Sequence, residues 1–209
     1  MSFASDYELT LWLMHRIDIF RHRRMSVVLP SARTSISRKI VPTEAGYYLG
    51  AVVVGLGATL FMDICALFLK RVFRIPLANY CLVGRWLLHM REGKFMHVSI
   101  AAASHKRSEC PIGWIAHYVT GTVYALALIA LVSGSWLARP TLLPALIFGI
   151  ASVLVPYLIM QPSFGLGIAA SKAPEPTRAR LRSLMAHTAF GVGLYVCAVA
   201  VSYVLPIHA

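Results

Sequence analysis

Three ionisable side chains interrupt otherwise apolar stretches of this sequence: Asp63, His117 and His187. A carboxylate in such a stretch is costly unless it is protonated, paired or facing a polar cavity. An aspartate with two histidines can hold a divalent metal ion, and histidine titrates near neutral pH, as proton transfer requires. The same side chains can also simply link helices by hydrogen bonds. The residues therefore predict a proton or ion site, with a metal site and a structural polar layer as the alternatives.

Three further polar residues are candidates for the same site. Gln161 follows the third apolar stretch, and Arg85 and His89 lie in a short apolar stretch between the first two. No Ser-His-Asp, H-E-x-x-H or paired-carboxylate arrangement occurs at a recognisable spacing, so no catalytic residue and no cofactor are assigned. The candidate substrate, proton or ion site consists of Asp63, His117, His187, Gln161, Arg85 and His89.

The composition predicts a membrane protein. Of the 209 residues, 58% are hydrophobic and only 13% are charged, whereas soluble domains carry about 25% charged residues. The formal net charge is +12, but the basic residues gather in loops beside apolar stretches, as is usual in membrane proteins. No basic stripe interleaved with aromatic residues appears, so nucleic acid is not an expected partner. The expected partners are membrane lipid and a second copy of the chain or another membrane protein.

Four apolar stretches position the candidate residues. They cover residues 46–69, 112–132 and 142–160, and a fourth stretch that starts at 183 or 184 and ends at 205. About 20 residues suffice for a helix to cross the hydrocarbon core. We expect the third stretch to be interrupted at Pro144 and Pro156. The first contains a G-x-x-x-G pattern at Gly46 and Gly50, which is typical of close helix contacts. The fold class is therefore all-α, a polytopic membrane protein with four transmembrane helices.

The segments outside the four spans differ in character. Residues 1–44 form a basic extension that is either disordered or lies on the membrane surface, while residues 45–209 form the four-helix membrane domain. Within loop one, residues 78–90 are apolar but too short to span, so they predict an interfacial helix. The segment 172–183 reads as an extended polar loop because it contains Pro174 and Pro176.

Basic residues also predict the orientation. Loops one and three carry twelve lysines and arginines, against eight in the rest of the chain. The positive-inside rule then places loops one and three in the cytoplasm and both termini outside. Asp63 lies six residues before the end of its span, about 9 Å deep at the helical rise. His117, His187 and Gln161 lie at the same end of their spans, so the polar residues are expected to form one layer near the cytoplasmic face.

The four cysteines are expected to be small buried hydrophobic residues. Cys65, Cys81, Cys110 and Cys197 form no C-x-x-C pair, and Cys65 and Cys197 lie inside apolar stretches. This spacing favours neither disulfides nor a zinc site.

Several short motifs, in order along all four spans, resemble the bacterial domain-of-unknown-function 2938 family. The resemblance covers residues 45–206 and implies a four-span protein of a bacterial inner membrane. It implies no biochemical activity, so an enzyme is not favoured. The motifs are Gly57-Ala-Thr-Leu-Phe-Met-Asp63, Asn79-Tyr80, Gly84-Arg-Trp86, His89-Met90, Gly113-Trp114, His117-Tyr118, Arg139-Pro-Thr-Leu-Leu-Pro-Ala145, Met160-Gln-Pro162, Ser183-Leu184, His187 and Phe190-Gly-Val-Gly-Leu-Tyr195.

Three functions remain open at this point. The first is a small permease or a proton- or ion-coupled transport component that uses the Asp/His layer near the cytoplasmic face. The second is a non-catalytic scaffold or assembly factor, in which that layer only holds the helices together. The third is a metal-dependent membrane enzyme with Asp63, His117 and His187 as ligands.

Overall fold

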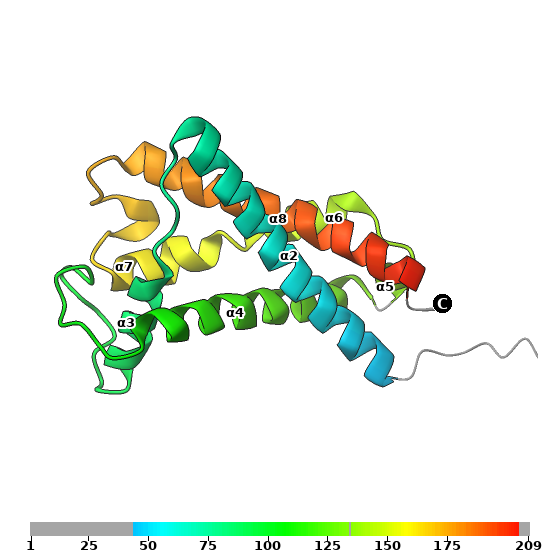
Figure 1. The fold of residues 1–209 in the computed structure, drawn as a ribbon, viewed down its shortest axis with the longest axis horizontal. Coiled ribbons are helices and arrows are strands. Elements are labelled where there is room, and N and C mark those ends of the chain that lie inside the picture. The colour runs from blue at the N-terminus through cyan, green and yellow to red at the C-terminus, as the bar shows by residue number, and fades with distance from the viewer. Residues whose placement is uncertain (1–43, 134, 205–209) are drawn as a thin grey trace, which may run out of the picture. The chain divides into compact units, whose positions relative to one another are not determined.

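The computed structural model describes residues 44–133 and 135–204, and the regular elements in these ranges are all helices (Figure 1). Four stretches are long and apolar enough to cross a membrane: Gly46–Phe73, Glu109–Val132, Leu142–Ser163 and Pro176–Val204. The predicted all-α class with four transmembrane helices is therefore confirmed. The predicted amino-terminal extension lies outside the described residues.

Helix α2 (Glu44–Phe73) packs against both α4 (Glu109–Val132) and α8 (Pro176–Val204), which it crosses in Figure 1. Small residues allow this close approach. A Cβ atom on Gly55 would lie 2.5 Å from the Cα atom of Thr122, and one on Gly121 would collide with the Thr59 side chain. Side chains larger than glycine would therefore push α2 away from α4.

The third span is broken. It consists of α6 (Leu142–Ala151), a π-helical turn η1 (Pro156–Met160) and α7 (Gln161–Ser163). Residues 152–155 connect α6 to η1, and α7 follows η1 directly. The break occurs at Pro156, which has no N–H to donate to the preceding turn. Pro144 was also expected to interrupt the helix, but it lies in the first turn of α6, where proline is tolerated because that N–H has no partner inside the helix.

The fourth span begins earlier than predicted. Its helix, α8, starts at Pro176, whereas the sequence indicated an extended loop as far as residue 183. Proline fits the first position of a helix because its fixed φ is helical and the missing N–H is not needed there. The first bond of the helix runs from the Ala179 N–H to the Glu175 carbonyl, 3.0 Å away. The two prolines therefore precede and start a helix rather than extending a loop.

The predicted interfacial helix in loop one is present as α3 (Tyr80–Met90), which packs along α4 (Figure 1). It starts where the Asn79 side chain accepts a hydrogen bond from the Cys81 N–H at 3.1 Å, a common helix-capping arrangement. A Cβ atom on Gly84 would collide with the Glu109 carbonyl. The two helices thus meet backbone to backbone.

This close contact overturns one expectation about the cysteines. Cys81 on α3 and Cys110 on α4 are joined by a disulfide, whereas Cys65 and Cys197 are free and half-buried. The sequence did not indicate the pair because 29 residues separate the two positions. Only the docking of α3 on α4 brings them together.

Two short helices complete the described chain. Helix α5 (Ser135–Ala138) lies in loop two, and the 3-10 turn η2 (Ile168–Ala170) precedes α8. Trp136 of α5 is buried among apolar residues, and its indole N–H donates to the Thr141 carbonyl at 3.2 Å. The apolar core therefore fills the end of the helical unit opposite to loops one and three, and the polar residues lie at the other end.

Candidate functional site

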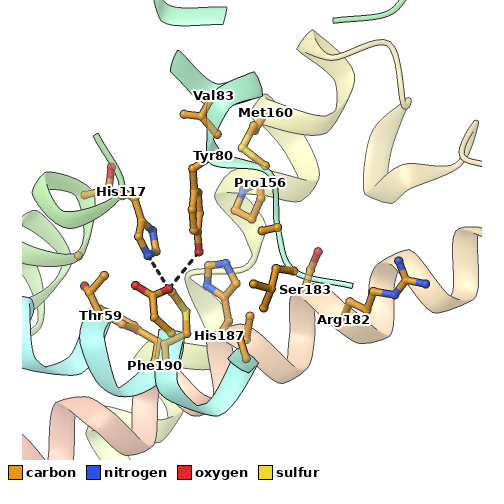
Figure 2. A pocket seen from close by; sticks show the side chains of 18 of the residues that line it. Thr59, Tyr80, Val83, His117, Pro156, Met160, Arg182, Ser183, His187 and Phe190 are labelled. Atoms are coloured by element: carbon orange, nitrogen blue, oxygen red, sulfur yellow. Dashed lines mark hydrogen bonds and ion pairs between the residues drawn. The ribbon is translucent and has the colours of Figure 1, made fainter. Parts of the chain in front are cut away.

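Asp63 on α2 is the centre of a polar cluster formed by three helices. Figure 2 shows two of its partners, His117 and Tyr80, with dashed lines for their hydrogen bonds. The Tyr118 hydroxyl donates to Oδ2 at 3.1 Å. His117 Nε2 lies 3.1 Å from Oδ1, and the Tyr80 hydroxyl donates to the same oxygen at 3.5 Å. His117 and Tyr118 come from α4, and Tyr80 is the first residue of α3. Asp63 and His117, two of the candidate residues, thus meet directly, and two tyrosines share the carboxylate.

Aromatic rings hold this cluster in place. The Tyr80 ring stacks on the His117 ring, with centroids 3.9 Å apart, and the Trp114 ring meets the Tyr80 ring edge-on at 4.7 Å. Burial of the Tyr80 phenol and the neighbouring Asp63 carboxylate raise the pKa of Tyr80 well above its usual range. Tyr80 therefore remains a hydrogen-bond donor to Asp63 at any physiological pH.

The Asp63 cluster forms part of the wall of a cavity. The cavity has a volume of about 580 Å³ and lies between α2, α3, α4, α8 and the broken third span. Its lining is mostly apolar, and it includes four of the predicted site residues, namely Asp63, His117, Gln161 and His187. Ligand pockets in proteins usually have volumes of roughly 300 to 1,000 Å³ and an apolar lining with a few polar groups. The cavity has the size and character of a small-molecule site.

His187 lines the same cavity but has a different partner from His117. Its Nδ1 lies 2.7 Å from the Ser152 hydroxyl oxygen, which itself lies 2.6 Å from the Gly149 carbonyl. In a regular helix the Val153 N–H would bond that carbonyl, but here it bonds Ile150 instead. The single hydroxyl proton of Ser152 therefore goes to Gly149, and His187 Nδ1–H donates to Ser152. This arrangement leaves His187 Nε2 as an acceptor.

Gln161 is the fourth polar residue of the lining. Its side-chain Nε2 donates to the Ser183 hydroxyl at 3.3 Å. Its Oε1 is buried and has no hydrogen-bond partner among the described residues. A buried acceptor without a partner costs free energy unless a ligand or water satisfies it. Gln161 therefore carries an unsatisfied buried acceptor at the place where the third span ends.

Arg85 and His89 do not line the cavity, although both were predicted as site residues. They are buried on the side of α3 that faces residues 100–109. Arg85 forms a two-point ion pair with Glu109, with Nε–Oε2 and Nη2–Oε1 distances of 2.8 and 2.7 Å. Its Nη1 also donates to the carbonyls of loop one, Ile100 among them at 3.2 Å. Arg85 thus organises loop one around α3.

The metal alternative gains no support from the geometry. In residues 44–133 and 135–204, the structure brings no three histidine, cysteine, aspartate or glutamate side chains into a metal-binding group. Asp63 and His117 meet directly, but His187 points its Nδ1 at Ser152. Metal sites need several ligands converging on one point.

The sequence did not identify four residues that shape the site: Tyr80, Trp114, Tyr118 and Ser152. A tyrosine beside a candidate histidine, as in His117-Tyr118, was a usable signal, because a phenol can reach the carboxylate that the histidine reaches. Tyr80 stood out only as part of the Asn79-Tyr80 motif, and Ser152 did not stand out at all, since their roles depend on the docking of α3 and on the break in the third span.

Comparison with known proteins gives a family but no activity. No curated protein and no solved structure matches the chain. One family profile, described as "Protein of unknown function (DUF2938)", matches residues 52–201. The matched range includes Asp63, His117, Gln161 and His187, and thus every predicted residue of the cavity wall. The chain therefore belongs to the DUF2938 family of proteins of unknown function.

Proposed function

We propose that this protein is a small transport component of the bacterial inner membrane, with Asp63 and His117 as its proton- or ion-binding pair. The observation that carries the proposal is the position of this pair in the wall of a cavity of about 580 Å³. A carboxylate in contact with an imidazole can exchange a proton near neutral pH. A solute that enters the cavity would alter the contact between the two, which would couple solute movement to a proton or ion.

The functional unit in this proposal is the membrane domain, residues 45–209, with residues 1–44 as an extension. Four spans are few for an alternating-access transporter, so the working form would be a homo-oligomer or a complex with another membrane protein. The apolar side chains Leu60, Ile64 and Phe68 on α2 are exposed, each by more than half. They would face lipid or the second subunit.

The orientation proposed here places loops one and three in the cytoplasm. Basic residues support it, since Lys70 and Arg71 lie in the last turn of α2. Arg178, Arg180 and Arg182 lie in the first turns of α8. The disulfide between Cys81 and Cys110 counts against it, because disulfides persist mainly in oxidising compartments. The proposed orientation therefore requires the cysteine pair to be reduced in the cell.

This orientation can be tested with an impermeant maleimide on intact cells. Lys94→Cys and Arg139→Cys place reactive thiols at exposed positions in loop one and loop two. We expect only Arg139→Cys to be labelled, and we expect acid-trapped Cys81 and Cys110 to be alkylated without added reductant. Labelling of Lys94→Cys in intact cells, or a disulfide between Cys81 and Cys110, would show that loops one and three lie outside the cytoplasm.

A scaffold is the second candidate function, because the Asp63 cluster also ties α2 to α3 and α4. The two functions predict different results for Asp63→Asn. If the cluster is only structural, the variant should lose stability or a partner. A transport site should lose activity while the variant still inserts in the membrane.

Everted membrane vesicles would test the transport proposal. Respiration acidifies their lumen, and a proton-coupled solute dissipates the pH gradient, which acridine orange reports. Amines, organic acids, sugars and metal salts would be added to vesicles with wild-type protein, with Asp63→Asn, and with Glu92→Gln as an acid-to-amide control outside the cavity. We expect one solute class to dissipate the gradient in wild-type and Glu92→Gln vesicles only. Equal responses from wild-type and well-inserted Asp63→Asn would refute the proposal.

A further inference from the structure

The charges around the cavity are unequal. Asp63 is the one acidic residue among the described residues that line it, and Arg182 is the one lysine or arginine. Arg182 is exposed at the start of α8, and in Figure 2 it extends away from Tyr80 and His187. The three hydrogen-bonding partners of Asp63 include no lysine or arginine. Around Asp63, the described lining therefore offers one carboxylate and no lysine or arginine.

Among the polar atoms of the wall that remain free, three are acceptors. A carboxylate has about four lone-pair sites, and three donors reach Asp63, so one site is left. Gln161 Oε1 is buried without a partner, and the Ser152 contact leaves His187 Nε2 as an acceptor. A ligand that satisfies these atoms must donate hydrogen bonds.

The rest of the wall suits an apolar body. Trp86, Trp114, Tyr124 and Phe190 line the cavity together with aliphatic side chains. Aromatic faces attract cations within about 6 Å of the ring centroid. The wall therefore combines one carboxylate, several acceptors and an aromatic, apolar surface.

We propose that the cavity binds an organic ammonium ion that carries N–H donors on an apolar body. This inference rests on the proposed function, because it names the class of solute that the transport site takes. The positive charge pairs with Asp63, the N–H groups donate to the free acceptors, and the apolar body packs against the aromatic wall. Carboxylates and neutral alcohols of the same size lack the charge, and quaternary ammonium ions lack the donors.

The test compares four probes with one apolar body: 4-phenylbutylamine, 4-phenylbutyl-trimethylammonium, 4-phenylbutanol and 4-phenylbutyrate. The full chain in lipid nanodiscs would be titrated at pH 7, with binding followed by calorimetry and by tryptophan fluorescence excited at 295 nm, since Trp86 and Trp114 line the cavity. We expect the amine to bind about tenfold or more tightly than the alcohol and the carboxylate, as expected for hydrogen bonds to a charged group. Binding of the carboxylate or the alcohol as tightly as the amine would overturn the proposal.

Variants separate charge from hydrogen bonding. Asp63→Asn should lower the affinity for the amine and for the trimethylammonium probe alike, by about tenfold. Gln161→Leu roughly keeps the size of the side chain but removes the Oε1 acceptor. It should lower the affinity for the amine and leave the affinity for the trimethylammonium probe unchanged. Glu92→Gln, outside the cavity, should bind every probe as the wild type does. Wild-type affinity for the amine in either cavity variant would overturn the proposal, and unfolding curves of each variant identify any that fail to fold.

The binding result and the transport result can fail separately. Amine binding with no solute-dependent change in the vesicle gradient would refute transport and leave the ligand class standing. A gradient that sugars or organic acids dissipate, without amine binding in nanodiscs, would refute the ligand class and leave transport standing.

Discussion

Asp63 and Glu109 are both carboxylates packed between α3 and a transmembrane helix, yet their surroundings differ. Both carboxylate oxygens of Glu109 pair with the Arg85 guanidinium. Glu109 also accepts a hydrogen bond from the Lys106 backbone N–H at 3.0 Å, and His105 Nδ1 lies 3.2 Å from its Oε1. Asp63 receives two tyrosine hydroxyls and one imidazole, and it borders a cavity. The Glu109 cluster is closed and neutralised.

This difference in surroundings distinguishes the Glu109 cluster, which is structural, from the Asp63 cluster, which can offer a binding site. A buried ion pair whose donors and acceptors are all satisfied has nothing left to offer a ligand, and its cost is covered by mutual pairing. Free acceptors at a cavity wall instead carry a standing cost, which a ligand can relieve. Variants in the two clusters should therefore have different consequences, which the following experiments compare.

The largest effect is expected from Arg85→Met, which leaves Glu109 as a buried charge without its partner. Removing one member of a buried pair costs about 3–5 kcal/mol, so the unfolding midpoint in detergent should fall sharply. The double variant Arg85→Met with Glu109→Leu should regain most of the loss, because no unpaired charge remains. A single variant as stable as the wild type would show that the cluster does not hold loop one.

Gly84→Ala should have the next largest effect, because its Cβ atom would collide with the Glu109 carbonyl. Overpacking of this kind costs about 1–3 kcal/mol, measured as the free energy of unfolding. The matched control is Gly57→Ala, whose Cβ atom would lie 2.7 Å from the Cys197 Sγ atom, a side chain that can move. If both variants lose the same stability, the backbone contact between α3 and α4 is not the cause.

Asp63→Asn should change stability little and ligand binding strongly. Two of its hydrogen bonds can persist to the amide oxygen, so the expected cost is about 1 kcal/mol. Unfolding in the same detergent measures this cost, with Glu109→Gln as the acid-to-amide comparison in the closed cluster. The contrast between the two clusters breaks down if Asp63→Asn is the more destabilising of the pair.

Ser152→Ala removes two hydrogen bonds, one to the Gly149 carbonyl and one from His187 Nδ1, each worth about 0.5–1.5 kcal/mol. Its informative result is the protonation of His187. Without the Ser152 acceptor, the Nδ1–H form loses its partner, and nitrogen NMR of labelled histidine should show a shift toward the Nε2–H form. An unchanged spectrum would mean that Ser152 does not fix the acceptor at Nε2.

Much of the fold followed from local patterns. The lengths of the apolar stretches predicted all four spans, and the short apolar segment in loop one predicted α3, because length and hydrophobicity are local properties. Helix ends were less predictable: α8 starts at Pro176 rather than near residue 183, since a proline can start a helix as well as interrupt a loop.

The candidate site was predictable only in part. Polar residues inside apolar stretches are rare, so Asp63, His117, Gln161 and His187 stood out, and all four line the cavity. Arg85 and His89 stood out in the same way but belong to loop one, because the sequence does not reveal which side of α3 faces the cavity. Tyr80 and Ser152 were missed as site residues because their contacts depend on how α3 docks and where the third span breaks.

The sequence by itself determined that this is a four-span membrane protein of the DUF2938 family with its polar residues at one end of the spans. The tertiary structure decided the rest: that Cys81 meets Cys110, that Arg85 pairs with Glu109, and that Asp63 meets His117 across 54 residues of chain. The physical reason is that hydropathy acts within one helix, whereas hydrogen bonds and cavities depend on how helices dock, through contacts between positions far apart in the chain.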